Sequence, residues 1–129
     1  MKILPTPTMT LSDADVTATL GNQTYGIYVD AAATSTQIGG TTAGAGNVIS
    51  GNGSDGIYMA GGNATVQGNM IGTNATGTGK VANVGRGIYV VGSTGHQIGG
   101  TTAADRNVIS GNSGGYNIYL STGADGTVI

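Results

Sequence analysis

A 16-residue segment that occurs twice constrains the fold of this chain more than any other feature. The sequence QIGGTTAGAGNVISGN at 37–52 returns as QIGGTTAADRNVISGN at 97–112, an offset of 60 residues. A looser version, VQGNMIGTNATGTGK, lies between the two copies at 66–80. Such self-similarity is typical of folds in which one structural unit stacks on the next, because a single unit cannot bury its apolar face alone.

A second motif, a tyrosine between two aliphatic residues, occurs four times at intervals of 30, 31 and 30 residues. In an extended strand, alternate side chains face opposite ways. If the aliphatic residues of each motif point inward, the tyrosines at its centre therefore point outward and in register. The four motifs are GIYV at 26–29, GIYM at 56–59, GIYV at 87–90 and NIYL at 117–120.

The apolar segments cycle through three strand types, of which the tyrosine motif is the second. Gly, Asn, Ser and Thr bound each short segment and favour turns, and no window carries a helical period. The pattern predicts an all-β fold, a parallel β-helix of about four coils with three short strands per coil. The first type comprises VTATL (16–20), NVISGN (47–52), MIGT (70–73) and NVISGN (107–112). The third comprises TQIGG (36–40), ATVQGN (64–69), HQIGG (96–100) and GTVI (126–129).

These motifs resemble the right-handed parallel β-helix repeats of large bacterial surface and secreted proteins, whose architecture is shared by pectate-lyase-like enzymes and phage tailspikes. The resemblance rests on NVISGN, GIYV, TVQGNMIGTNATGTG and IGGTTA…RNVISGN, and covers the chain from about residue 14 to its end. It implies a right-handed coil and an extracellular or cell-surface location within a larger protein. It does not specify the function, because one architecture hosts many.

Equivalent residues of stacked coils are expected to lie above one another at a spacing of about 4.8 Å. Aliphatic residues such as Ile49, Ile71 and Ile109 would then fill the interior as a ladder. Three asparagines that each follow a glycine are expected to form a single structural ladder at one corner of the coil. They are Asn52, Asn69 and Asn112.

Composition excludes several classes of function. The formal net charge is −2 with 4 Lys and Arg residues in total, so no basic surface for nucleic acid is expected. The absence of cysteine excludes disulfides and thiolate metal sites. No apolar run approaches the roughly 20 residues of a membrane span. Residues 1–12 are interpreted as a linker or expression-derived segment without a signal peptide, and residues 13–129 as a single β-helix domain.

The acidic residues do not predict an enzyme. Enzymes that resemble this architecture cluster acidic residues on one strand face, whereas the aspartates here fall in turns of different coils and glutamate is absent. The only histidine, His96, is expected in a surface turn, and we expect no catalytic residues, no metal site and no cofactor. A calcium-binding turn at 50–58 is a weak alternative. The aspartates are Asp13, Asp15, Asp30, Asp55, Asp105 and Asp125.

The outward tyrosines are the candidate functional residues. Four in register would form a strip about 14 Å tall. They could simply stabilise the ladder, but a contiguous aromatic patch usually marks a partner surface. We predict a non-catalytic, self-associating structural module, with a homotrimer as the first expectation and a polysaccharide as the alternative partner. The strip comprises Tyr28, Tyr58, Tyr89 and Tyr119, widened at its ends by Tyr25 and Tyr116.

Overall fold

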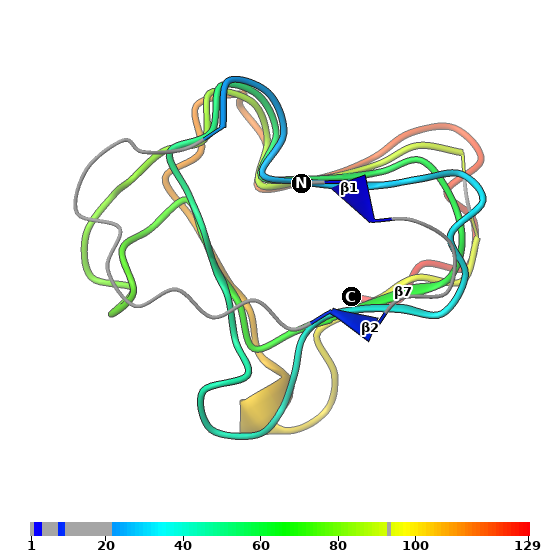
Figure 1. The fold of residues 1–129 in the computed structure, drawn as a ribbon, viewed down its shortest axis with the longest axis horizontal. Helices are drawn as coiled ribbons and strands as arrows, with labels where there is room; N and C mark the ends of the chain where they lie inside the picture. The colour runs from blue at the N-terminus through cyan, green and yellow to red at the C-terminus, as the bar shows by residue number, and fades with distance from the viewer. Residues whose placement is uncertain (1, 4–7, 10–21, 93) are drawn as a thin grey trace.

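The chain folds as a parallel β-solenoid in which three short strands recur in each coil (Figure 1). The structure, a computed structural model, describes residues 2–3, 8–9, 22–92 and 94–129. All strand pairs in this part are parallel, and its one helix is the three-residue 3-10 turn η1 at Ala103–Asp105. The predicted all-β fold with three strands per coil is confirmed.

Three sheets form the sides of the solenoid, and each complete coil passes through sheets A, B and C in turn. Sheet A contains β1 (Lys2–Ile3), β3 (Ile27–Val29), β6 (Ile57–Met59), β9 (Ile88–Val90) and β12 (Ile118–Leu120). Sheet B contains β2 (Thr8–Met9), β4 (Thr36–Gly39), β7 (Ala64–Gln67) and β10 (Gln97–Ile98). Sheet C contains β5 (Val48–Ile49), β8 (Met70–Ile71) and β11 (Val108–Ile109).

The described residues form about three complete coils rather than the four predicted. The complete coils are β3–β4–β5, β6–β7–β8 and β9–β10–β11. A further coil begins with β12, but the segment 126–129 adds only an isolated bridge from Val128 to Gln97 instead of a strand. The segment 16–20, which the sequence assigns to the first cycle, lies outside the described residues.

The solenoid is right-handed. In the view along its axis the chain runs clockwise through the three sheets, and later coils lie farther from the viewer (Figure 1). Sheets A and B lie on opposite sides of the coil, as the positions of β1 and β7 show (Figure 1). Side chains that point outward from sheet A are therefore far from those that point outward from sheet B.

The N-terminal segment 1–12 is described only at residues 2–3 and 8–9. Lys2–Ile3 pairs with β3 and Thr8–Met9 pairs with β4, so both short strands extend sheets of the solenoid. The boundary predicted between residues 12 and 13 lies outside the described residues.

Apolar side chains fill the interior as the motifs predict. In β3, β6 and β9 the residues on either side of the tyrosine are at most 1% exposed. Ile49 and Ile71 are buried on the sheet C side, and the half-buried Ile109 packs against the core. Burying such a side chain contributes about 1.5–3 kcal/mol. At β12 the pattern weakens, because Ile118 is half-buried and Leu120 is 39% exposed.

The asparagines form two ladders, so the single ladder of Asn52, Asn69 and Asn112 is corrected. Asn69 precedes sheet C, together with Asn47 and Asn107. Its Oδ1 accepts a hydrogen bond from Asn47 Nδ2 at 2.8 Å, and its Nδ2 donates to Asn107 Oδ1 at 3.0 Å. Asn69 and Asn47 are buried, so these bonds satisfy amide groups that would be costly to leave unpaired.

The other ladder follows sheet C and contains Asn52, Asn83 and Asn112. Asn52 Nδ2 donates to Asn83 Oδ1 at 2.7 Å, and Asn83 Nδ2 donates to Asn112 Oδ1 at 2.8 Å. The second coil carries an extra loop closed by an antiparallel bridge between Thr73 and Lys80. Because of this insertion, the asparagine of the second coil in this ladder is Asn83, which does not follow a glycine. The Gly-Asn pattern therefore predicted Asn69 in its place.

Replacing Asn83 by alanine is expected to lower the free energy of unfolding by about 3 kcal/mol or more. Asn83 is fully buried, and its side chain bonds Asn52, Asn112 and the carbonyl of Ile49, so its loss leaves several buried groups unpaired. Denaturant unfolding measures the change. The matched control Asn63→Ala, at an exposed position, should stay within about 0.5 kcal/mol. Equal effects of the two variants would contradict the ladder's role.

Candidate functional site

The four central tyrosines stack in register on the outer face of sheet A. Tyr28 pairs with Tyr58, Tyr58 with Tyr89, and Tyr89 with Tyr119 in the strand register. Their ring centroids are 5.4, 5.2 and 5.3 Å apart, respectively. Each tyrosine is half-buried between buried aliphatic neighbours in β3, β6 and β9. The alternation of a strand therefore places the rings outside, as predicted.

Tyr25 and Tyr116 extend this column at its two ends. The Tyr25 ring lies 5.8 Å from Tyr28 and 4.7 Å from Tyr58, and the Tyr116 ring lies 5.1 Å from Tyr119. All six tyrosines of the chain thus form one continuous cluster, which we call the tyrosine strip. Each aromatic pair of this kind contributes about 0.5–1.5 kcal/mol beyond the burial of its area.

A second column, which sequence reasoning missed, runs beside the strip. Tyr25, Asp55, Arg86 and Tyr116 occupy the same position in successive coils, just before the residue that begins each tyrosine motif. The backbone bonds from Gly26 N to Asp55 O, from Gly56 N to Arg86 O and from Gly87 N to Tyr116 O follow this register. The signal was available in the sequence as the residue preceding each motif.

Asp55 and Arg86 link the middle coils of this column. The buried Asp55 Oδ1 accepts a hydrogen bond from Arg86 N at 2.7 Å and lies 3.5 Å from Arg86 Nη1. The guanidinium carbon of Arg86 lies 4.1 Å from the Tyr89 ring centroid and 4.8 Å from that of Tyr119. Arg86 is therefore held over two rings of the strip by cation–π contacts, which contribute about 0.5–1 kcal/mol at partly exposed sites.

The environment of Tyr58 disfavours its ionised form. Partial burial raises the pKa of Tyr58 above its ordinary value, and the neighbouring Tyr25, Tyr89, Tyr28 and Asp55 raise it further. Its position at the centre of the strip explains this, because a phenolate there would lie among other ionisable groups of the same sign. Tyr58 therefore holds its phenolic proton more firmly than an isolated tyrosine does.

A column of outward polar side chains that could bond the hydroxyls of a sugar lies on sheet B. Gln37, Thr65 and Gln97 form a register column on sheet B. Sheet B lies on the opposite side of the coil from sheet A (Figure 1). The outer face of sheet A therefore presents aromatic rings without that polar column.

His96 is buried, which corrects the expectation of a surface turn. It is 1% exposed, and its Nδ1 accepts a hydrogen bond from Ala64 N at 3.1 Å. The alternation of the strand explains this position, because His96 lies two residues before the inward-facing Ile98 and stacks on Ala64 and Thr36. Burial lowers the pKa of His96 below its ordinary value.

The described aspartates lie in different coils and corners of the solenoid. Asp55 bonds Arg86, and Asp105 is buried and accepts a hydrogen bond from Thr102 N at 2.8 Å. Asp30 and Asp125 lie in turns of the first and last coils. No group of three or more His, Cys, Asp or Glu residues in the described ranges could hold a metal ion. Asp13 and Asp15 lie outside those ranges.

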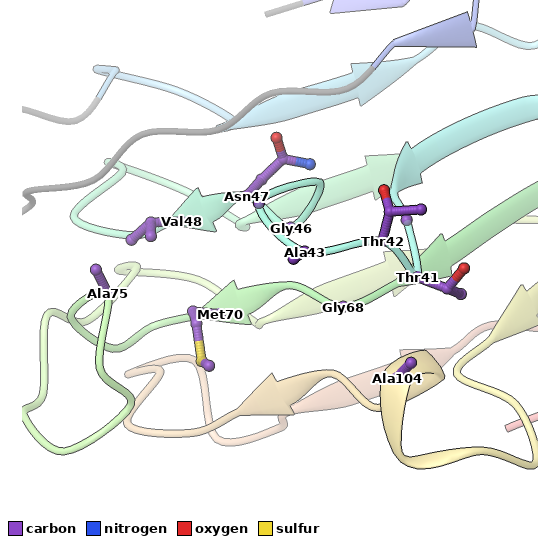
Figure 2. Close-up of a pocket in the computed structure, with 12 residues that line it drawn as sticks. Thr41, Thr42, Ala43, Gly46, Asn47, Val48, Gly68, Met70, Ala75 and Ala104 are labelled. Atoms are coloured by element: carbon purple, nitrogen blue, oxygen red, sulfur yellow. The ribbon is translucent and has the colours of Figure 1, made fainter.

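A hollow of about 500 Å³ opens on the corner between sheets B and C (Figure 2). It exists because the second coil joins β7 to β8 directly through Gly68, whereas the first coil carries a projecting loop at 40–46 and the third carries η1. Threonine, alanine, glycine, Asn47, Val48 and Met70 line it, and none of these side chains titrates. The lining therefore supplies no acid, base or charged group for chemistry.

In a tyrosinate absorbance titration, Tyr58 is expected to ionise above pH 10. Unfolded tyrosine ionises near pH 10, so a raised pKa means that the folded state holds this proton longer. The stability that the protonated Tyr58 contributes is fully present below about pH 10. It is lost as the pH rises through the pKa of Tyr58 in the folded state. The difference between wild type and Tyr58→Phe isolates this ionisation. A difference curve centred at or below pH 10 would contradict this.

Acid is expected to weaken the fold through His96. In the unfolded chain, the histidine side chain gains its proton near pH 6.5. Burial lowers the pKa of His96 in the folded state. The stability that the neutral His96 contributes is therefore complete above about pH 6.5 and is lost as the pH falls below that value. Denaturant unfolding between about pH 7.5 and pH 5 measures the loss. His96→Gln, which keeps an acceptor for Ala64 N, should show a flatter profile, and identical profiles would refute the assignment.

The described part of the chain has no helix that is long and apolar enough to cross a membrane. Comparison of the chain with protein-family models, with curated proteins and with solved structures finds no match. What the chain shares with parallel β-helix proteins is the parallel coil of three strands.

Proposed function

We propose that this chain is a non-catalytic structural module that associates with copies of itself through the tyrosine strip. The observation that carries the proposal is that all six tyrosines of the chain form one contiguous cluster, on the outer face of sheet A and the turns just before its strands. Tyrosine suits an interface because it offers a large rigid body whose hydroxyl stays hydrogen-bonded.

The distribution of the outward residues supports a partner over a purely internal role. Stacked aromatic rings would stabilise the ladder on any of the three sheets, since each cross-strand pair contributes about 0.2–1 kcal/mol wherever it lies. The outward register positions of sheet B include Gln37, Thr65 and Gln97, and those of sheet C include Val48 and Met70. Gathering all six rings on sheet A makes that face differ from the others, as expected of a docking surface.

A structural role also agrees with the chemistry of the described residues. The carboxylates of Asp55 and Asp105 are engaged in hydrogen bonds within the fold, and His96 is enclosed in the interior. These groups support the coil instead of converging on a cavity. We place the module in a secreted or cell-surface bacterial protein, as the resemblance of its repeats implies, and as part of a longer chain.

A polysaccharide is the alternative partner, and the geometry of the rings supports it less. Sugars stack on free ring faces, but Tyr28 and Tyr58 stack on each other with an interplanar angle of 11°, and Arg86 lies over Tyr89 and Tyr119. The hydroxyl-bonding column of sheet B is on the opposite side of the coil. The strip therefore favours a flat protein partner.

The strip is small, so the association should be reversible. Three gaps at the cross-strand spacing make it about 14 Å tall, whereas stable interfaces bury about 1,200–2,000 Å² in total. An interface limited to this face lies at the low end of that range. The chain should therefore dissociate on dilution instead of forming a permanent assembly.

Light scattering on a sizing column, over a hundredfold range of concentration, tests the proposal. The apparent mass should rise with concentration above the 12.6 kDa of one chain. Tyr58→Ser and Tyr89→Ser should lower the association by removing rings from the centre of the strip. Gln37→Ser, on the opposite sheet, is the matched control and should associate as wild type does.

Two results would overturn the proposal. One is a mass of 12.6 kDa at every concentration. The other is association that the tyrosine variants leave unchanged although circular dichroism shows that they are folded. Binding of soluble polysaccharides that broadens the tyrosine signals of a monomeric chain would support the alternative partner instead.

A further inference from the structure

The two ends of the tyrosine strip differ in the charged residue that lies beside them. One half holds three closely packed rings and a buried carboxylate, and the other half holds a guanidinium on two rings. We call them the acidic half and the basic half. The acidic half comprises Tyr25, Tyr28, Asp55 and Tyr58, and the basic half comprises Arg86, Tyr89, Tyr116 and Tyr119.

Arg86 is the more exposed of the two charged residues in the column beside the tyrosine strip, and Lys2 lies in register with Tyr28 at the edge of sheet A. The side chain of Arg86 is 31% exposed, whereas that of Asp55 is 6% exposed. The contact between them at 3.5 Å is long for an ion pair, and Arg86 Nε is buried without a hydrogen-bond partner among the described residues. The guanidinium is thus incompletely satisfied within its own chain and lies over rings at the surface of the strip.

We infer that two copies pair through the tyrosine strip in antiparallel orientation, so that Arg86 of each copy lies against the acidic half of the other. This inference rests on the proposed self-association. The two-fold axis runs along the strands of sheet A, and it exchanges the first coil with the last and the second with the third. Each guanidinium then meets the stacked rings of Tyr28 and Tyr58 near the Asp55 carboxylate, an arrangement that satisfies both charge and cation–π complementarity.

Parallel arrangements lack this complementarity. In a parallel dimer, or in a cyclic trimer with its axis along the solenoid, equivalent residues lie at the same height, and the Arg86 side chains converge. Like charges opposite one another across an interface are unfavourable. The position of one arginine therefore favours an antiparallel pair over the trimer that the resemblance to tailspike-like fibres suggested.

Removing the charge of Arg86 is the first test. Arg86→Gln should raise the dissociation constant of the pair at least about tenfold, because the two-fold axis makes each cation–π contact occur twice. Arg106→Gln is the matched control, since Arg106 is exposed beside η1 on the far side of the coil, and it should change the constant less than about twofold. Thermal unfolding of the monomer checks that both variants keep the fold.

Cysteine cross-linking then fixes the orientation, because the chain has no cysteine of its own. Gln23 and Ser113 are exposed and occupy the same column in the first and last coils, as the bonds from Gly53 N to Asn22 O, Val84 N to Asn52 O and Ser113 N to Asn83 O show. An antiparallel pair brings Gln23→Cys of one copy close to Ser113→Cys of the other. A short thiol cross-linker should therefore join the two variants when they are mixed, in preference to joining either one to itself.

The outcomes separate the inference from the proposed function. Mixed cross-links, a dimer mass and a weaker Arg86→Gln pair support the antiparallel arrangement. A trimer mass, or cross-links within each single variant, would overturn the arrangement and leave self-association standing. An Arg86→Gln pair as tight as wild type would also overturn it. A chain that stays monomeric at all concentrations would overturn both.

Discussion

Parallel backbone pairing between successive coils is the constraint on which the rest of the structure depends. Each strand of sheets A, B and C bonds the equivalent strand of the next coil without a shift in register. Any side chain is therefore stacked on its counterpart about 4.8 Å away. Interior aliphatic columns, the asparagine ladders and the tyrosine strip are three consequences of that one rule, applied inside the coil, at its corners and on its outer face.

The corners show how a chain with 26 glycines and few charges remains ordered. Asparagine amides before and after sheet C bond one another and the backbone of adjacent coils, so polar groups at the turns are satisfied inside the fold. Glycine permits the close approach that this requires. At Gly39, with φ of 78°, a side chain would meet the Gln67 carbonyl oxygen at 2.1 Å. Loops such as 74–79 can project from these corners without disturbing the stack.

Much of the fold could be predicted because equivalent residues of the sequence repeats pair with one another in successive coils. The inward isoleucines and the outward tyrosines both followed from a period of two within each motif. The incorrect predictions concern residues at which the two-residue alternation of a strand was not applied, or at which an insertion interrupted the repeat. His96 occupies an inward-facing position of its strand, although it was expected in the turn just before that strand, and Asn83 was hidden by the extra loop in the second coil. The Asp55–Arg86 contact was missed because the residues that precede the four tyrosine motifs were not compared with one another, although they stack in the same register as the motifs.

Solvent exposure of the rings shows whether a second copy of the chain covers the tyrosine strip. A soluble paramagnetic agent broadens the ring signals of accessible tyrosines in nuclear magnetic resonance spectra. Broadening of the tyrosine signals should fall as the protein concentration rises, while side chains of the opposite sheet, such as Gln37 and Gln97, stay equally exposed. Rings that remain as accessible at high concentration as at low concentration would contradict the proposed self-association.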